Sequence, residues 1–93
     1  MGLKFEWHPN KANWNKRKHN VSFAEASTVF ADPLSATVHD PDHSVEEDRY
    51  ITVGFSERNR LLIVSHTERG DRIRIISARE LTTSERKDYE EEF

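Results

Sequence analysis

The sequence predicts an α+β fold: an antiparallel β-sheet meander with two N-terminal helices and one C-terminal helix packed on one face, in the order β-α-α-β-β-β-β-α. Apolar residues recur at helical spacing before residue 33, whereas beyond it they alternate with polar residues. Such alternation is typical of strands with one buried face. Short polar turns at Arg58-Asn59 and Arg69-Gly70 separate three strand-like segments, which favours an antiparallel meander.

The first expected strand covers residues 3–7, where Leu, Phe and Trp alternate with Lys and Glu. Pro9 follows, and proline suits the first residue of a helix because it lacks the amide hydrogen that a helix start leaves unpaired. No helix-breaking residue interrupts the chain up to Asn20, a residue type that tolerates the left-handed conformation at a helix end. We therefore expect a helix from Pro9 to Asn20.

A second helix is expected to begin after Ser22, because Ser22 and Glu25 have the spacing of a capping box. Its apolar residues fall on one helical face, and these are Phe23, Ala26, Val29 and Phe30. Asp32-Pro33 ends it, since a residue before proline is disfavoured in a helix. Residues 34–39 then form an expected edge strand, and residues 40–45 form a polar loop.

Three longer strands are expected over residues 47–56, 61–67 and 72–78. A second capping box, formed by Thr82 and Glu85, opens a final helix that runs through Tyr89 and ends in an acidic segment. The chain contains no repeat and no linker, so residues 1–93 are predicted to form a single domain.

The register of the three longer strands follows if both hairpin loops contain two residues. The buried face then carries the rows Ile51, His66 and Ile73; Val53, Val64 and Ile75; and Phe55, Leu62 and Ser77. The opposite face carries Tyr50, Thr67 and Arg72; Thr52, Ser65 and Arg74; and Gly54, Ile63 and Ile76. The second face is rich in hydroxyl and guanidinium groups and bears one aromatic ring, which suits RNA phosphate and bases.

The composition restricts the class of protein. The chain has 93 residues and no cysteine, so it has neither a disulfide framework nor a thiolate metal site. It has no apolar signal segment and no stretch long enough to cross a bilayer, and we expect a cytoplasmic protein with no membrane partner. No His, Asp and Glu spacing resembles a zinc site, and neither a metal nor another cofactor is expected.

The formal net charge of −3 hides an alternation along the chain. Residues 1–20 carry five basic residues against one acidic residue, and residues 58–79 carry six against two. Residues 21–57 carry one basic residue against eight acidic residues, and residues 80–93 carry two against six. The two basic blocks either neutralise their acidic neighbours or combine into one positive face that suits phosphate.

Six motifs resemble the BrnT family, the toxins of bacterial type II toxin-antitoxin modules. They are F-E-W-H-P-N-K-A (5–12), N-x-x-K-H-N-V-S-F-x-E-A (15–26), V-F-A-D-P-L (29–34), E-D-R-Y (47–50), R-I-R-I-I-S-A-R (72–79) and E-R-x-x-Y (85–89). This resemblance implies a fold similar to RelE-type ribonucleases. Family members usually have Asp at the position of His8 and Gly at that of Asn20, so both ends of the first helix depart from the family pattern.

The resemblance further implies an endoribonuclease that cleaves messenger RNA and slows growth. The expected partner is a BrnA-like ribbon-helix-helix antitoxin that covers the toxin. The complex would contact operator DNA only through the antitoxin.

RNA cleavage without a metal requires a base for the ribose 2′-OH, an acid for the leaving 5′-oxygen and cations for the phosphorane. The catalytic candidates are Lys18, His19, Glu47, Arg49, Arg74 and Arg79, and the RNA-binding candidates are Tyr50, Thr52, Ser65, Thr67 and Arg72. Arg74 is the first choice for the phosphate clamp, since a guanidinium presents two parallel N–H groups. His19 is the most natural acid or base, because histidine titrates near neutrality.

Each candidate also has a structural interpretation. Arg74 can pair with a surface carboxylate, and cations at Lys18-His19 complement a helix dipole. Glu47 and Arg49 form either a catalytic pair or a structural ion pair. For the whole chain, the alternatives to an endoribonuclease are a noncatalytic nucleic-acid-binding module and a protein-interaction module.

Overall fold

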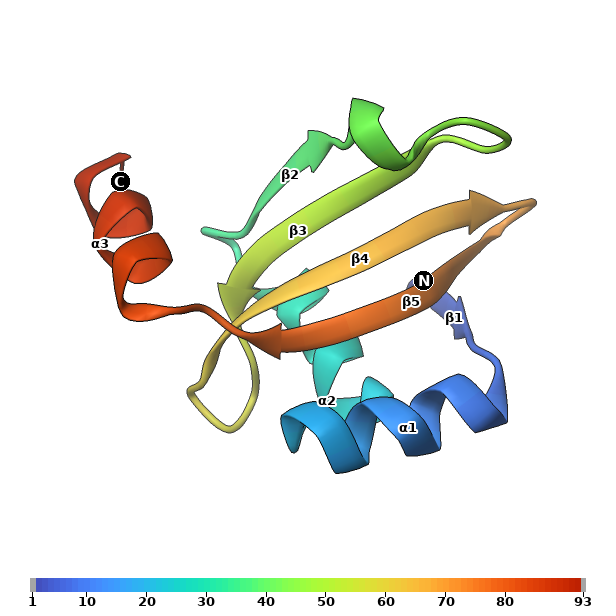
Figure 1. The fold of residues 1–93 in the computed structure, drawn as a ribbon, viewed down its shortest axis with the longest axis horizontal. Coiled ribbons are helices and arrows are strands. Elements are labelled where there is room, and N and C mark those ends of the chain that lie inside the picture. The colour runs from blue at the N-terminus through green and yellow to red at the C-terminus, as the bar shows by residue number, and fades with distance from the viewer. Residues whose placement is uncertain (1, 93) are drawn as a thin grey trace.

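The computed structural model describes residues 2–92 and confirms the predicted order of elements (Figure 1). The elements are β1 (Lys4–Glu6), α1 (Pro9–His19), α2 (Phe23–Thr28), the 3-10 helix η1 (Val29–Ala31), β2 (Ala36–His39), the 3-10 helix η2 (Pro41–His43), β3 (Arg49–Phe55), β4 (Leu61–Arg69), β5 (Arg72–Glu80) and α3 (Thr83–Glu92). No helix in the described part of the chain is long and apolar enough to cross a membrane.

The five strands form one mixed sheet in the order β1-β5-β4-β3-β2. Strands β2 to β5 form the predicted antiparallel meander. β1 adds a parallel neighbour to β5, with Phe5 opposite Ile73. Figure 1 looks onto the face of the sheet that α2 does not cover, whereas α1 lies along the side of β5. We call this uncovered side the open face.

The core lies between α2 and the other face of the sheet. Its buried residues are Val21, Phe23, Ala26, Val29, Leu62, Val64, Ile75 and Ala78. The apolar stripe predicted for the second helix supplies three of them, and Phe30 packs against their edge. The helical part of the apolar pattern therefore predicts correctly which side of α2 meets the sheet.

The ends of α1 accommodate both departures from the family pattern. His8 occupies the N-cap, where its Nδ1 accepts a hydrogen bond from Asn10 N at 3.1 Å. Asn20 adopts the left-handed conformation with φ of 57°, and its amide donates to Lys16 O at 2.9 Å. His8 thus caps the start of α1 in place of the family's Asp, and Asn20 takes the left-handed position at its end in place of the family's Gly.

The register predicted between β3 and β4 is wrong by one residue. Residues 56–60 form a longer loop than the assumed two-residue turn, with Asn59 at φ of 60°. Tyr50, rather than Ile51, therefore lies opposite His66. A shift of one residue exchanges the two faces of a strand, so Ile51 and Val53 lie on the open face.

Thr52 and Tyr50 consequently lie on the packed side of the sheet, and the prediction that they share a face with Ser65 is wrong. Thr52 is fully buried, and its Oγ1 lies 2.7 Å from both His66 Nε2 and Thr37 Oγ1. The Tyr50 ring stacks on His66 with ring centroids 6.0 Å apart. The hydroxyl that the sequence suggests for RNA is thus used inside the core.

The register between β4 and β5 also differs, because the turn falls at Gly70-Asp71 and the ladder contains a bulge. Arg69 lies opposite Arg72, His66 opposite Ile75 and Ser65 opposite Ser77. Ile76 has no partner in this ladder and is the extra residue of a β-bulge. The bulge reverses the alternation, and it places Ala78 in the core and Arg79 on the open face.

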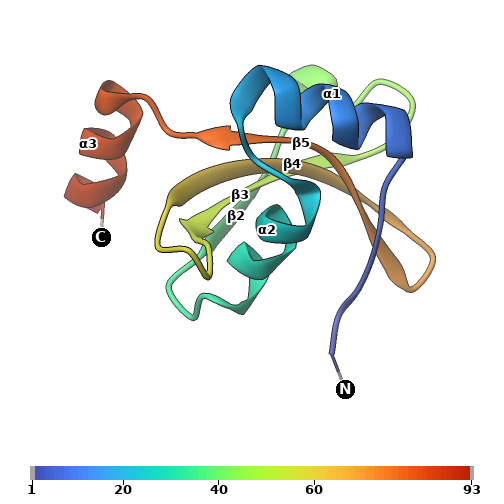
Figure 2. The same cartoon turned by 90° about the horizontal axis from the view of Figure 1, so that it is seen from below.

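Helix α3 differs from its predicted position, since it projects beyond the end of β5 instead of covering the core with α2 (Figure 2). The predicted capping box is present: Thr82 Oγ1 accepts from Glu85 N at 3.2 Å, and Glu85 Oε1 accepts from Thr82 N at 2.9 Å. Tyr89 Oη donates to Leu34 O at 3.2 Å. The helix is therefore held at its first turn and by more distant contacts, which include the one from Tyr89 to Leu34 and that of the Arg86 guanidinium, 6.0 Å from the centroid of the Phe55 ring.

Candidate active site on the open sheet face

A pocket of about 330 Å³ lies on the open face between the C-terminal end of α1 and the loop that follows β2. Its lining residues are His19, Asp40, His43, Arg49, Ile51, Ile63, Ser65, Ile76, Ser77, Ala78 and Arg79. Four of the eleven predicted site residues, His19, Arg49, Ser65 and Arg79, meet here although they come from four different elements. An apolar floor with two guanidinium groups and two imidazoles suits a phosphodiester with its attached bases.

His19 is the last residue of α1 and forms one side of the pocket. Partial burial lowers the pKa of His19 below its ordinary value, and the neighbouring charges of Lys18 and Arg79 lower it further. The imidazole is therefore neutral near pH 7 and carries a free lone pair. Lys18 does not line the pocket, and its ammonium lies 4.5 Å from the centroid of the Trp14 ring.

Arg79 reaches the pocket from the end of β5 and is held by Glu85 at the start of α3. Its Nη1 and Nη2 donate to the two carboxylate oxygens of Glu85 at 2.7 and 3.0 Å. This hydrogen-bonded pair lowers the pKa of Glu85 to about 2 and raises that of Arg79. Both side chains are more than a third exposed, so solvent and ligands have access to the pair.

Arg49 opens β3 on the open face, because the observed register reverses the side on which the sequence places it. Its Nε lies 3.8 Å from Glu47 Oε2, which is too far for a hydrogen bond. Both side chains are partly exposed. The pair is therefore not hydrogen-bonded. Arg49 Nε is buried without a hydrogen-bond partner among the described residues, while the side chain as a whole is partly exposed and lines the pocket.

His43 is a site residue that the sequence did not indicate. It lies in η2, and its Nδ1 is 2.8 Å from Asp40 Oδ2. A carboxylate only accepts hydrogen bonds, so the contact places a proton on Nδ1 and leaves Nε2 for other partners. Asp40 and His43 stand three residues apart in a polar loop, and a carboxylate at that spacing is the one signal that singles out this histidine.

Asn15 holds α1 against β5 and so sets the position of His19 beside Arg79. Its side chain is buried, donates to Ala78 O at 2.8 Å and Val21 O at 2.9 Å, and accepts from Ala78 N at 3.1 Å. The side-chain amide of Asn15 thus satisfies both backbone hydrogen-bonding groups of Ala78, as a neighbouring strand would. Ala78 precedes Arg79 directly, so Asn15 joins two sides of the pocket.

Other predicted residues lie away from this pocket. Arg74 Nε donates to Glu6 Oε2 on the neighbouring β1 at 2.8 Å. Thr67 is buried, and its hydroxyl donates to Asp48 O at 2.6 Å. Arg72 is exposed near the β4–β5 turn, opposite Arg69. None of these three side chains belongs to the lining of the pocket.

No group of three His, Asp or Glu side chains that could hold a metal ion occurs among residues 2–92. The pocket instead offers paired cations and imidazoles. That donor set is suited to the phosphate oxygens and proton transfers of RNA cleavage.

The structure combines a small mixed sheet, α2 packed on one face of that sheet and a basic pocket on the other face. Residues 7–85 match the profile of the family described as "Ribonuclease toxin, BrnT, of type II toxin-antitoxin system", and the chain therefore belongs to the BrnT family.

The fold is similar to that in the crystal structure of the Brucella abortus ribonuclease toxin, BrnT, with a TM-score of 0.64. The two chains are 19% identical over an alignment that covers 88% of this chain and all of the Brucella chain. No curated protein sequence matches the chain.

Proposed function

We propose that this toxin is a metal-independent endoribonuclease that cleaves messenger RNA by attack of a ribose 2′-OH on the adjacent phosphate. The observation that carries the proposal is the meeting of two histidines and two arginines in one pocket on the open face. The attack forms the new 2′-oxygen–phosphorus bond and breaks the bond to the 5′-oxygen. The products are a 2′,3′-cyclic phosphate and a 5′-hydroxyl end.

His19 takes the proton from the 2′-OH in this proposal. A general base must be unprotonated at working pH, and the lowered pKa of His19 keeps its imidazole neutral near pH 7. The same cations that lower this pKa, Lys18 and Arg79, favour a negatively charged substrate beside it.

His43 delivers a proton to the leaving 5′-oxygen. Asp40 holds the ring through Nδ1, so Nε2 is the atom that carries the transferred proton. A carboxylate that orients a histidine and stabilises its charged form is a recurring device in proton-transfer sites. His19 and His43 line the same pocket from separate elements. This suits a reaction in which one group takes a proton from the 2′-OH and another gives a proton to the 5′-oxygen of the same phosphate.

Arg79 and Arg49 stabilise the charge that develops on the phosphorane. The Arg79 guanidinium already holds a planar carboxylate with two hydrogen bonds, and the same fork matches two phosphate oxygens. RNA must therefore compete with Glu85 for Arg79. Arg49 supplies a second positive charge whose nearest carboxylate, Glu47, is 3.8 Å away.

The proposed partner is a BrnA-like ribbon-helix-helix antitoxin that binds operator DNA and neutralises the toxin by covering the open face. Occlusion predicts that RNA and antitoxin compete. A noncleavable RNA analogue titrated against the preformed complex should release antitoxin, and simultaneous binding of both would contradict neutralisation by occlusion.

The function is tested by incubating the protein with RNA in the presence of EDTA. We expect new 5′-hydroxyl ends, and we expect no cleavage at a 2′-deoxy position because the nucleophile is missing. Binding of RNA without cleavage by the wild type would support the noncatalytic nucleic-acid-binding module instead. Cleavage at 2′-deoxy positions would contradict the proposed nucleophile.

A further inference from the structure

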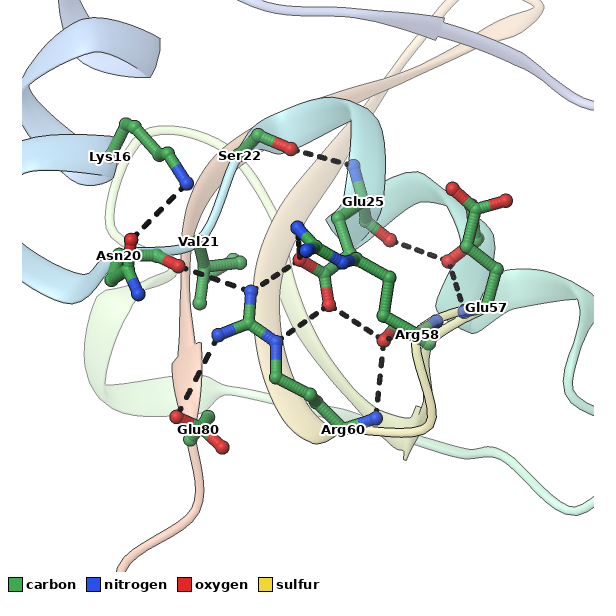
Figure 3. Close-up of polar contacts among 12 residues, drawn as sticks. Lys16, Asn20, Val21, Ser22, Glu25, Glu57, Arg58, Arg60 and Glu80 are labelled. Carbon is green, nitrogen blue, oxygen red and sulfur yellow. Dashed lines mark hydrogen bonds and ion pairs between the residues drawn. The ribbon is translucent and has the colours of Figure 1, made fainter.

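A second basic pocket lies on the other side of the α1 terminus. It has a volume of about 300 Å³ and is lined by Lys16, Asn20, Arg58 and Arg60. Figure 3 shows Lys16 and Asn20 at the end of α1, across from the two arginines of the loop between β3 and β4. No residue of the active site proposed above belongs to its lining.

One of its three cations has a structural role. Arg60 donates to both carboxylate oxygens of Glu25, through Nε at 2.9 Å and through Nη2, and to Asn20 O at 3.1 Å. Glu25 also accepts from the Ser56 hydroxyl at 2.7 Å and is almost fully buried. The oxygens of Glu25 are thus occupied, and Arg60 is fixed in the wall of the pocket.

The other two cations are not engaged in this way. Arg58 Nη1 lies 4.0 Å from Glu25 Oε1, and its side chain is 66% exposed. Lys16 has no ion pair among residues 2–92, and its Nζ donates to the neutral Asn20 Oδ1 at 3.2 Å. Three cations therefore face Glu25 and Glu80, the latter 3.8 Å from Arg60, and the pocket has an excess of positive charge.

The two pockets adjoin along both elements that separate them. His19 lines the active site and the next residue, Asn20, lines the basic pocket. Arg79 lines the active site and the next residue, Glu80, lies beside Arg60. Consecutive Cα atoms are about 3.8 Å apart, so the two pockets border each other at these residues. An RNA strand that leaves the active site across this border brings a neighbouring phosphate to the basic pocket.

We propose that Lys16, Arg58 and the Asn20 side chain form a second phosphate-binding subsite, which holds a backbone phosphate of the RNA strand next to the one that is cleaved. This inference rests on the proposed ribonuclease function. The subsite has no apolar lining residue, whereas the centre of a protein interface is apolar. The chemistry therefore favours a phosphate of RNA over an acidic protein partner.

The test compares a double variant, Lys16→Ala with Arg58→Ala, with a control, Lys11→Ala with Arg69→Ala. Both variants lose one lysine and one arginine, the control residues are exposed and line neither pocket, and Arg60 stays in place to pair with Glu25. The substrates are a ribodinucleotide, which has one phosphodiester, and a hexaribonucleotide. Affinity for a 2′-deoxy hexanucleotide is measured at several salt concentrations.

We expect the double variant to lower the ratio of kcat/KM on the hexaribonucleotide to that on the dinucleotide by about tenfold, because only the longer substrate reaches the subsite. Its affinity for the deoxy hexanucleotide should fall by a similar factor. The salt slope should become less negative by about 0.7 for each phosphate that the variant no longer neutralises. The control variant should leave the ratio and the slope unchanged.

An equal loss in both variants would overturn the subsite, since it would reflect only the general positive field. So would a double variant that binds RNA normally but binds the antitoxin weakly, because the pocket would then belong to the protein interface. If the wild type cleaves no RNA, the ribonuclease proposal fails, and the deoxy hexanucleotide alone decides the subsite. A tenfold weaker affinity of the double variant supports it, and unchanged affinity overturns it.

Discussion

Two arginine–glutamate pairs have the same chemistry in two environments: Arg60–Glu25 joins the loop after β3 to α2, and Arg79–Glu85 joins the end of β5 to the start of α3. Arg60 and Glu25 form a bidentate ion pair in which the side chains are 22% and 4% exposed, respectively. Arg79 and Glu85 form a similar pair with side chains 38% and 37% exposed. The first fixes the loop of residues 56–60 to α2, whereas the second lies at the active-site pocket.

The difference in exposure distinguishes an ion pair that stabilises the fold from an ion pair that a ligand can reach. Removing one partner of a buried pair leaves a charge without water or a counter-ion, and this is strongly destabilising. An exposed pair contributes little because water competes for both groups. We therefore propose that Glu85 is an exchangeable partner of Arg79, which a phosphate of RNA can replace, whereas the buried Glu25 is a permanent partner of Arg60.

The largest expected effect is on stability and follows from Glu25→Ala. This change leaves Arg60 without its main partner, and it should lower the free energy of unfolding by about 3 to 5 kcal/mol. Urea denaturation measures the loss. Glu85→Ala is the matched control and should cost less than about 1 kcal/mol; equal losses in the two variants would remove the distinction between the pairs.

Arg79→Ala should have the largest effect on catalysis. The loss of a guanidinium from the transition state is expected to lower the cleavage rate by about 30- to 1000-fold, which corresponds to about 2 to 4 kcal/mol. The thermal unfolding midpoint should change little, since the pair is exposed. Arg79→Lys keeps the charge without the planar fork and should have an activity between those of the wild type and Arg79→Ala; full activity of Arg79→Ala would contradict the proposed clamp.

The pH dependence of the Arg79–Glu85 pair gives a smaller effect of defined sign. The folded protein holds the pKa of Glu85 at about 2 instead of 4.5, so the pair stabilises the fold above the unfolded value and loses this contribution as pH falls from about 5 towards 2. Carbon-13 NMR of the carboxyl groups should find the pKa of Glu85 well below its ordinary value in the wild type, and higher in Arg79→Ala, where only the hydrogen bonds with Thr82 still lower it. An unchanged titration would show that Arg79 is not the cause.

A further shift is expected at His19, whose pKa is lowered by burial and by Lys18. Lys18→Ala should raise this pKa, so the acid limb of the pH profile of kcat/KM should move to higher pH if His19 acts as the base. Arg17→Ala removes a neighbouring exposed charge that is not among the causes of the His19 shift, and it should leave the limb in place. A limb that stays in place in Lys18→Ala would assign the base to another residue.

The smallest effect is expected from Arg74→Ala. Its partner Glu6 lies outside the pocket, so cleavage should stay within about twofold of the wild type, and stability should fall by no more than about 1 kcal/mol. Parallel assays of cleavage and thermal unfolding check both values. A loss as large as that of Arg79→Ala would restore Arg74 as the clamp.

Local signals in the sequence predicted the elements well. The structure contains the capping box of Thr82 and Glu85, the helical start at Pro9 and the break at Asp32-Pro33, and it contains the Ser22 half of the other predicted capping box. Glu25 shows the limit of such signals. The amide of Glu25 is capped as predicted, but its carboxylate binds Arg60, which is 35 residues away in the sequence.

Residues of the candidate site could be predicted only where residue chemistry alone points to them. His19, Arg49, Ser65 and Arg79 were identified as a basic residue, a titratable group or a strand hydroxyl, and all four line the pocket. The errors arose from pairing between strands. The loop of residues 56–60 moved Thr52 into the core, and the parallel strand β1 supplied Glu6 to Arg74, which no short-range pattern reveals.

The bulge at Ile76 shifts the alternation of core-facing and pocket-facing side chains along β5 by one residue. Before it, odd-numbered residues of β5 face the core, and after it even-numbered ones do, so Ile75 and Ala78 are both buried while Ser77 and Arg79 reach the pocket. If the same residues were paired as a regular strand without the bulge, Ser77 and Arg79 would face the hydrophobic interior and Ala78 would face the pocket, whereas deletion of Ile76 would leave all three on their present faces. The bulge therefore lets β5 contain one residue more than β4 between Ile75 and Ser77 while Arg79 stays on the open face.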